Sequence, residues 1–130
     1  MDQVKASIGK DHYKTSLATA TNSIIADEPV KLGGAGLGFS PTELLASALA
    51  TCTCVTLRMY ADRKEWPLEQ VDVAVSFERD QENGGSSMVR LIELHGNLSL
   101  EQRERLLQIA NQCFIHKTLT SPINITSQLV

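Results

Sequence analysis

The sequence predicts an α+β fold, in which one long and one shorter helix pack on antiparallel β-sheets. Three observations support this prediction. A stretch after Pro41 holds no glycine and no further proline up to Ala61. Alternating apolar and polar residues mark strands on both sides of it, and a second helical pattern begins after Ser99. The length of 130 residues fits a single domain, 1–130, which is long enough to bury about two-thirds of its unfolded surface.

The composition is that of a globular protein without a nucleic-acid partner. Hydrophobic residues make up 42% of the chain and charged residues 21%, which is too apolar for a disordered protein. A net charge of −3 argues against a surface that binds nucleic-acid phosphates. No apolar signal sequence is visible near the start, and the apolar part of the long helix, Leu44 to Leu57, is shorter than the roughly 20 residues of a membrane span. We therefore expect a cytoplasmic protein with no membrane partner.

The first elements are short strands followed by a glycine-rich loop. Residues Val4 to Ile25 alternate in a way typical of a meander of two or three strands. The loop from Leu32 to Pro41 leads into the long helix, where free N–H groups could cradle a phosphate. It lacks the Gly-Lys-Ser/Thr of a phosphate-binding loop and does not match the dinucleotide-binding spacing. These absences favour a flexible connecting loop.

The long helix is predicted from Pro41 to Lys64. Ser40 suits the N-cap position, Pro41 the first helical position and Glu43 the third, a combination that satisfies the N–H groups of the first turn. Pro67 prevents continuation. The helix is apolar nearly all round, so we expect it inside a core or a dimer interface. One apolar face collects Leu45, Ala48, Cys52, Val55 and Met59.

The chain after this helix predicts a hairpin. Val71 to Phe77 alternates apolar with polar residues, the segment Asp80 to Ser87 is a turn, and Met88 to Leu94 is the returning strand. On the returning strand, Val89, Leu91 and Glu93 are assigned to one face.

Helices and a last strand are predicted in the remaining residues. Ser99 and Gln102 form a capping box that opens a helix from Leu100 to about Gln112. A short further turn of helix covers Phe114 to Leu119. A final strand is expected from Ile123 to Leu129.

The three cysteines are the first candidates for chemistry. Cys52 and Cys54 point about 200° apart on one helix and cannot form a disulfide with each other. A Cys52–Cys113 pair is plausible if the two helices pack together. The alternatives are three small buried hydrophobes, or a zinc site of Cys113, His116 and Cys52. A reactive Cys52 needs a lowered pKa, for which the candidate cations are Lys10, Lys14, Lys31, His12 and His116.

Several motifs together resemble the OsmC/Ohr family, and in particular its OsmC-like branch of redox proteins. Residues 33–66 read GGAGLGFSPTELLASALATCTCVTLRMYADRKEW, and residues 109–119 read IANQCFIHKTL. The resemblance implies an intertwined homodimer of α+β subunits, with the long helix buried at the dimer interface. It also implies that Cys52 is the peroxidatic cysteine and Cys113 the resolving one, while Cys54 belongs to the core.

The resemblance also shows a departure at the activating residues. Characterised peroxidases of the family carry a Glu directly after the loop proline, paired with an upstream Arg. Here Thr42 occupies that position, Glu43 lies about 100° further around the helix, and no Arg precedes Arg58. Thr42, Glu43, Lys31 and His116 are therefore the candidates for a supporting role.

The function implied is the thiol-dependent reduction of organic hydroperoxides, with a small dithiol or lipoyl-type reductant and without a cofactor or metal. One alternative is a non-catalytic protein that binds a small apolar or thiol ligand in the dimer cleft. Another is a stress-induced structural domain whose cysteines are core residues.

Overall fold

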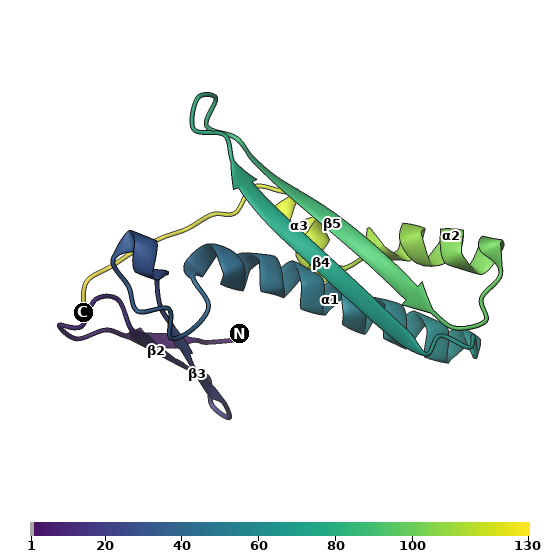
Figure 1. Ribbon diagram of the computed structural model, residues 1–130, viewed down its shortest axis with the longest axis horizontal. Helices are drawn as coiled ribbons and strands as arrows, with labels where there is room; N and C mark the ends of the chain where they lie inside the picture. Colours follow the sequence, from purple (N-terminus) through teal and green to yellow (C-terminus); the bar gives the residue numbers. More distant parts are fainter. Residues whose placement is uncertain (1) are drawn as a thin grey trace. The chain divides into compact units, whose positions relative to one another are not determined.

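The computed structural model describes residues 2–130 and shows the predicted α+β fold, with antiparallel sheets and one long helix (Figure 1). The chain divides after Leu45 into two compact units, an N-terminal unit and a C-terminal unit that runs from Ala46 to Val130. Each unit is described by itself below. The single domain, 1–130, stays a prediction.

The N-terminal unit contains the predicted meander. Strands β1 (Lys5–Ser7), β2 (Thr15–Ala18) and β3 (Ser23–Ala26) form one antiparallel sheet in the order β1-β2-β3. Lys5 pairs with Ala18 across the first ladder, and Thr15 pairs with Ala26 across the second.

A buried carboxylate organises the loop that follows the sheet. Asp27 is 2% exposed, and its Oδ1 accepts hydrogen bonds from the N–H groups of Tyr13 and Glu28. Its Oδ2 accepts from the N–H groups of Ala35 and Leu37, both at 3.2 Å. Burial alone would raise the pKa of Asp27, but these four bonds lower it below its ordinary value.

The glycine-rich loop is therefore tied down, and the expectation of a flexible connection is wrong. The loop begins with the 3₁₀ helix η1 (Val30–Leu32). Gly34 and Gly38 pass so close to the carbonyl oxygens of Glu28 and Ile25 that neither has room for a Cβ. Because Asp27 already takes up N–H groups of this loop, a side-chain anion sits where a phosphate-binding loop would hold its ligand.

Helix α1 (Pro41–Lys64) has the predicted bounds. Glu43 Oε1 accepts from the Ser40 N–H at 3.0 Å, and Ser40 Oγ accepts from the Glu43 N–H at 3.3 Å, which is the predicted capping box. At the other end the Trp66 N–H bonds the Ala61 carbonyl oxygen at 2.9 Å. Glu65 takes a left-handed conformation with φ 57°, so the helix stops before Pro67.

The face of α1 that packs inside the chain differs from the predicted one. The buried residues are Leu49, Thr53, Leu57 and Ala61. Two residues of the predicted apolar face, Val55 and Met59, are 50% and 59% exposed. Because α1 is apolar nearly all round, its sequence does not reveal which stripe the neighbouring elements cover.

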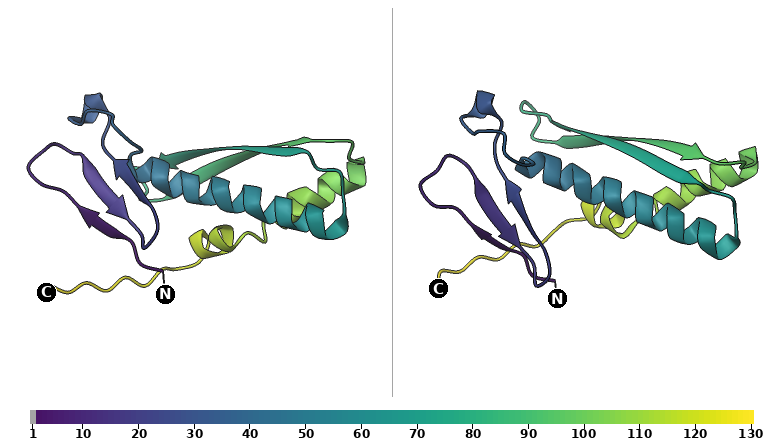
Figure 2. Two further views of the ribbon diagram at one scale, coloured as in Figure 1. Left: turned by 90° about the horizontal axis from the view of Figure 1, so that it is seen from below. Right: turned by 60° about the horizontal axis from the view of Figure 1, so that its bottom comes forward.

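The C-terminal unit places the helices on one face of a hairpin. Strands β4 (Gln70–Arg79) and β5 (Ser86–His95) pair antiparallel, and helices α2 (Leu100–Ala110) and α3 (Phe114–Leu119) follow them. Helices α1 and α2 lie on the same side of the hairpin (Figure 2). The core joins them through Leu57, Ala61, Leu68, Leu98, Leu106, Ile109 and Ala110.

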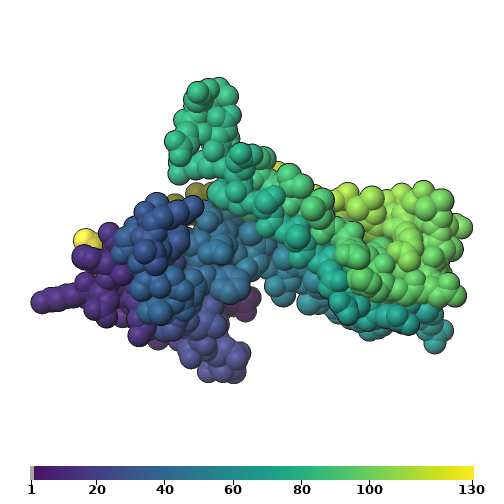
Figure 3. Space-filling model, viewed as in Figure 1, coloured from purple at the N-terminus to yellow at the C-terminus, as the bar shows by residue number. Residues whose placement is uncertain are grey.

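Val89, Leu91 and Glu93 share one face of β5, as predicted, and this face is the exposed one. Met88, Arg90, Ile92 and Leu94 are half-buried, whereas Val89 and Leu91 are 56% and 66% exposed. The residues that alternate with them therefore face the helices. The hairpin turn projects from the rest of its unit, in teal in the space-filling view (Figure 3).

The predicted last strand, Ile123 to Leu129, is wrong for the chain as described. The segment has no strand or helix assignment, and Ile125 is 80% exposed. A strand requires a neighbouring backbone with which to exchange hydrogen bonds, and residues 2–130 show no ladder to this segment.

Length and composition alone would allow α1 to cross a membrane, contrary to the expectation that its apolar part is too short. An 18-residue window of the helix has a mean hydropathy of 1.4, and 22% of that window is buried. Core helices of soluble proteins pass the same test, so a membrane role does not follow. The cytoplasmic location stays a prediction.

Candidate active site

Two of the three cysteines meet inside the C-terminal unit. Cys52 is half-buried in the middle of α1, and Cys113 is fully buried at the N-cap of α3, in the turn after α2. The Cys113 thiol donates a hydrogen bond to the sulfur of Cys52. All three cysteines are free thiols.

The surroundings of Cys52 favour its thiolate. Burial raises the pKa of Cys52, but four donors outweigh this effect and hold the pKa below its ordinary value. These donors are the Cys113 thiol, the backbone N–H groups of Ile115 and Phe114, and the Thr56 hydroxyl, which lies 4.0 Å away.

Backbone N–H groups thus lower the pKa of Cys52, a role for which the sequence suggested a side-chain cation. The N–H groups of Phe114 and Ile115 belong to the first turn of α3, where a helix has no partners of its own for them. The turn after α2 directs them at the sulfur.

Cys113 has the opposite electrostatic character. Burial raises the pKa of this thiol, and its hydrogen bond to Cys52 raises it further. The N–H groups of His116 and Ile115 lower the pKa of Cys113 only in part. In the pair, Cys52 is therefore the sulfur that loses its proton first.

His116 lies beside the pair but is not a cation there. Burial lowers the pKa of His116, and the positive charge of Arg90 lowers it further. The His116 Nδ1 lies 3.2 Å from an Arg90 guanidinium nitrogen, and an arginine can only donate. Both effects disfavour a charged imidazole, and the supporting role of His116 toward Cys52 stays a prediction.

Arg90 is a site residue that the sequence pattern did not reveal. It lies on the inner face of β5, opposite Val75, and its guanidinium contacts α1, the end of α2 and α3. The available signal was an arginine at a position whose neighbours two residues away, Met88 and Ile92, point into the protein.

The other supporting candidates lie in the N-terminal unit, where the structure defines their local contacts. Glu43 belongs to the capping box, and hydrogen bonds from Ser40 lower the pKa of its carboxyl group. The Thr42 hydroxyl lies 3.3 Å from the Ser40 hydroxyl. Lys31 is exposed on η1. Their roles toward Cys52 stay predictions.

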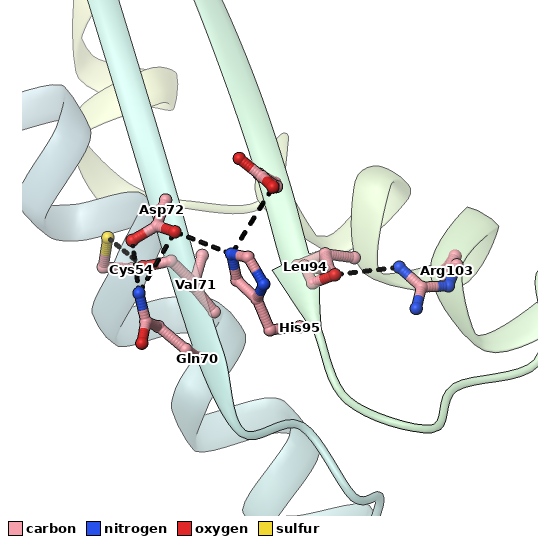
Figure 4. A network of polar contacts seen from close by, with 8 residues as sticks. Cys54, Gln70, Val71, Asp72, Leu94, His95 and Arg103 are labelled. Carbon is pink, nitrogen blue, oxygen red and sulfur yellow. Dashed lines mark hydrogen bonds and ion pairs between the residues drawn. The ribbon is translucent and has the colours of Figure 1, made fainter.

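Cys54 has a different setting from Cys52. Its thiol points toward β4 and donates to the carbonyl oxygen of Val71 at 3.9 Å (Figure 4). Burial raises the pKa of Cys54, and the negative charge of Asp72 raises it further. Cys54 is thus held as a neutral thiol, as expected of a packing residue.

A polar cluster on the hairpin is the place where the described residues could hold a cation. His95 Nε2 lies 2.7 Å from Asp72 Oδ2 and 3.6 Å from Glu93 Oε1 (Figure 4). The three side chains can offer donor atoms within 4.8 Å of one another. Hydrogen bonds from Gln70 and then from His95 lower the pKa of Asp72. His95 thus has hydrogen-bonding partners within the hairpin.

Comparison with known proteins supports the resemblance on which these candidates rest. A family model described as OsmC-like protein matches residues 33–128. No curated protein matches the sequence.

Solved structures share the fold. An OsmC-like protein from Mycoplasma pneumoniae superposes with a TM-score of 0.80 at 20% identity, covering 92% of this chain and 87% of that one. An organic hydroperoxide resistance protein OsmC from Legionella pneumophila gives 0.67 at 22%, covering 92% and 88%. The organic hydroperoxide resistance protein OhrB of Bacillus subtilis gives 0.63 at 19%, covering 91% and 89%.

Proposed function

Because the chain belongs to the OsmC-like protein family, we propose that it is a thiol-dependent peroxidase that reduces organic hydroperoxides. Cys52 is the peroxidatic cysteine and Cys113 the resolving one. The observation that carries this proposal is the hydrogen bond between the two thiols, in surroundings that lower the pKa of Cys52 and raise that of Cys113. The names of the Legionella and Bacillus proteins support the substrate class.

The first step follows from the thiolate character of Cys52. The thiolate attacks the terminal oxygen of the hydroperoxide, the O–O bond breaks, and the alkoxide leaves as an alcohol after it takes up a proton. Cys52 becomes a sulfenic acid. The N–H groups of Phe114 and Ile115 favour the thiolate that makes this attack, because their hydrogen bonds lower the pKa of Cys52.

The second step uses the neighbouring thiol. The Cys113 sulfur attacks the Cys52 sulfur, an S–S bond forms, and the S–O bond breaks to release water with the proton of the Cys113 thiol. A small dithiol or lipoyl-type reductant then reduces the disulfide in two exchange steps and leaves as its own disulfide. No metal or cofactor takes part in this cycle.

The proposed functional unit is a homodimer. Val55 and Met59 leave an apolar stripe of α1 exposed within the C-terminal unit, which a second subunit would cover in an intertwined dimer. The same dimer would offer the extended segment from Ile123 to Leu129 a strand with which to pair. Both features support the assembly that the family resemblance implied.

Turnover of an organic hydroperoxide with dithiothreitol or a lipoyl donor tests the proposal. Wild type and Cys54→Ser should consume the hydroperoxide, whereas Cys52→Ser should match the buffer blank. Peptide mapping after one equivalent of oxidant should find Cys52 joined to Cys113 in the same subunit. A wild type no faster than Cys52→Ser would contradict the enzyme and favour a non-catalytic protein that binds a small apolar or thiol ligand.

A further inference from the structure

Arg90 holds the turn that carries Cys113. We propose that Arg90 is a positioning residue that keeps Cys113 against Cys52 and so sets the rate at which the Cys52 sulfenic acid is resolved. The inference rests on the proposed peroxidase function and extends it to a residue on β5 whose hydrogen bonds, among residues 2–130, go to other groups than the two sulfurs.

The hydrogen bonds of Arg90 surround Cys113 along the chain. One nitrogen, Nη1, donates to Thr53 Oγ1 at 3.1 Å and to the Ala110 carbonyl oxygen at 3.3 Å. The other, Nη2, donates to Asn111 Oδ1 at 2.9 Å and contacts His116 Nδ1 at 3.2 Å. Three of these acceptors lie within three residues of Cys113, on both of its sides.

The fourth acceptor anchors this turn to the helix that carries Cys52. Thr53 follows Cys52 in α1 and is fully buried. Its hydroxyl donates to the Leu49 carbonyl oxygen at 2.7 Å, so a lone pair remains to accept from Arg90. One guanidinium thus connects α1 with the turn between α2 and α3.

The chemistry of arginine suits this role. The guanidinium is planar and offers five N–H donors in a rigid fork, whereas a lysine ammonium is a compact charge on a flexible stem. None of the four acceptors is a carboxylate, and no ion pair within residues 2–130 involves Arg90. Its bonds therefore fix geometry without neutralising its charge. One of them goes to the Ala110 carbonyl oxygen at the end of α2, which also accepts from the Cys113 N–H at 3.3 Å.

Resolution is the step that depends on this geometry. To form the disulfide, the Cys113 sulfur must approach the Cys52 sulfur in line with the S–O bond that breaks, from the side opposite the oxygen. Attack on the hydroperoxide, in contrast, needs Cys52 alone. Misplacing a reacting group by about 1 Å can slow a reaction roughly a hundredfold. Loss of Arg90 should therefore slow disulfide formation more than it slows sulfenic acid formation.

The test separates the two steps in Arg90→Gln and Arg90→Lys. Rapid mixing with one equivalent of hydroperoxide should show sulfenic acid formation within about threefold of wild type and disulfide formation slowed roughly ten- to a hundredfold. With excess hydroperoxide, both variants should accumulate more Cys52 sulfinic acid. Arg103→Gln is the matched control, because Arg103 also donates to two carbonyl oxygens, those of Leu94 and Gly96, at 3.0 Å each. It should behave as wild type.

A milder variant covers the case in which Arg90 variants do not fold. Asn111→Ala removes one exposed acceptor of Arg90 and should slow disulfide formation in the same direction. A folded Arg90→Gln with unchanged disulfide formation, or with both steps slowed equally, would overturn the positioning role. So would an Asn111→Ala protein that forms the disulfide at the wild-type rate when neither Arg90 variant folds.

A measurement without hydroperoxide distinguishes failure of this inference from failure of the proposed function. In a glutathione redox buffer, the equilibrium constant for forming the Cys52–Cys113 disulfide should be at least about tenfold smaller in Arg90→Gln than in wild type. The reason is that the two thiols are no longer held together. If wild type shows this equilibrium but consumes no hydroperoxide, the proposed function fails and the positioning role stands. If hydroperoxide is consumed and Arg90→Gln leaves the equilibrium unchanged, the positioning role alone fails.

Discussion

The thiol of Cys113 donates a hydrogen bond to the sulfur of Cys52. Burial raises the pKa of both thiols, but this bond lowers the pKa of Cys52 and raises that of Cys113. One contact therefore shifts the pKa values of the two thiols in opposite directions, because it favours a thiolate on α1 and a protonated thiol in the turn after α2. The separation is what a peroxidatic and a resolving cysteine require.

Removing the donor should weaken the Cys52 thiolate. In Cys113→Ala the pKa of Cys52 should rise, and alkylation of Cys52 near neutral pH should slow roughly tenfold for each unit of that rise. The pH dependence of iodoacetamide modification, followed by mass spectrometry of the Cys52 peptide, measures this change.

Cys113→Ser is the matched control for that experiment. Its hydroxyl can still donate to Cys52, so it should restore part of the thiolate that Cys113→Ala loses. Equal alkylation profiles for wild type and Cys113→Ala would show that the thiol–thiol bond does not determine the reactivity of Cys52.

Asp27 should make the N-terminal unit sensitive to acid. Burial raises its pKa, but the four N–H bonds lower it more, so the folded pKa lies below the unfolded one. Its contribution to stability is therefore complete above the ordinary aspartate pKa of about 3.9 and is lost as the pH falls through the folded value. Asp27→Asn should expose the amides of Ala35 and Leu37 to hydrogen exchange at neutral pH, and its difference from wild type should shrink in acid.

Asp11→Asn provides the comparison, since Asp11 is exposed in the same unit. This variant should exchange hydrogen as wild type does at every pH. Unchanged protection of Ala35 and Leu37 in Asp27→Asn would mean that other contacts hold the glycine-rich loop.

Two neighbouring leucines on α2 should differ sharply in their contribution to stability. Leu106 is fully buried in the core, whereas Leu107 is 60% exposed. Leu106→Ala should lower the free energy of unfolding by about 2–5 kcal/mol, and Leu107→Ala should change it by less than about 0.5 kcal/mol. Urea unfolding of both variants checks the assignment, which similar losses in the two would contradict.

The exposed stripe of α1 should be needed for the proposed homodimer. A charge at its centre, as in Val55→Glu or Met59→Glu, would have to be buried without a partner, which is unfavourable. We expect sedimentation to show dimers for wild type and monomers for these variants. Arg63→Glu alters an exposed charge near the end of the same helix and should remain dimeric. A monomeric wild type would rule out the dimer, and dimeric variants would place the interface elsewhere.

The sequence by itself determined the elements that short-range chemistry defines. The bounds of α1 follow from Ser40, Glu43 and Pro67, all within or beside the helix that they begin or end. The Ser99–Gln102 capping box of α2 forms as predicted, and the alternation of β4 and β5 predicted their hairpin. These interactions link residues that are close in the chain, so the sequence pattern contains both partners.

The family could also be inferred from the sequence, because its motifs are local and come in a specific order. The family resemblance implied that Cys52 and Cys113 form the candidate pair. The structure then showed that the two thiols interact.

Only the tertiary structure decided which surfaces and partners these elements use. The buried side of α1 is that of Leu57, because α1 is apolar nearly all round and the position of the hairpin and α2 selects one stripe. Arg90 reaches the cysteine turn from a strand more than twenty residues away in sequence, and Asp27 collects N–H groups from both sides of its loop. Such contacts join residues that are distant in the chain, and no local pattern encodes them. The segment from Ile123 to Leu129 has the alternation of a strand, but a strand exists only where another backbone completes its hydrogen bonds.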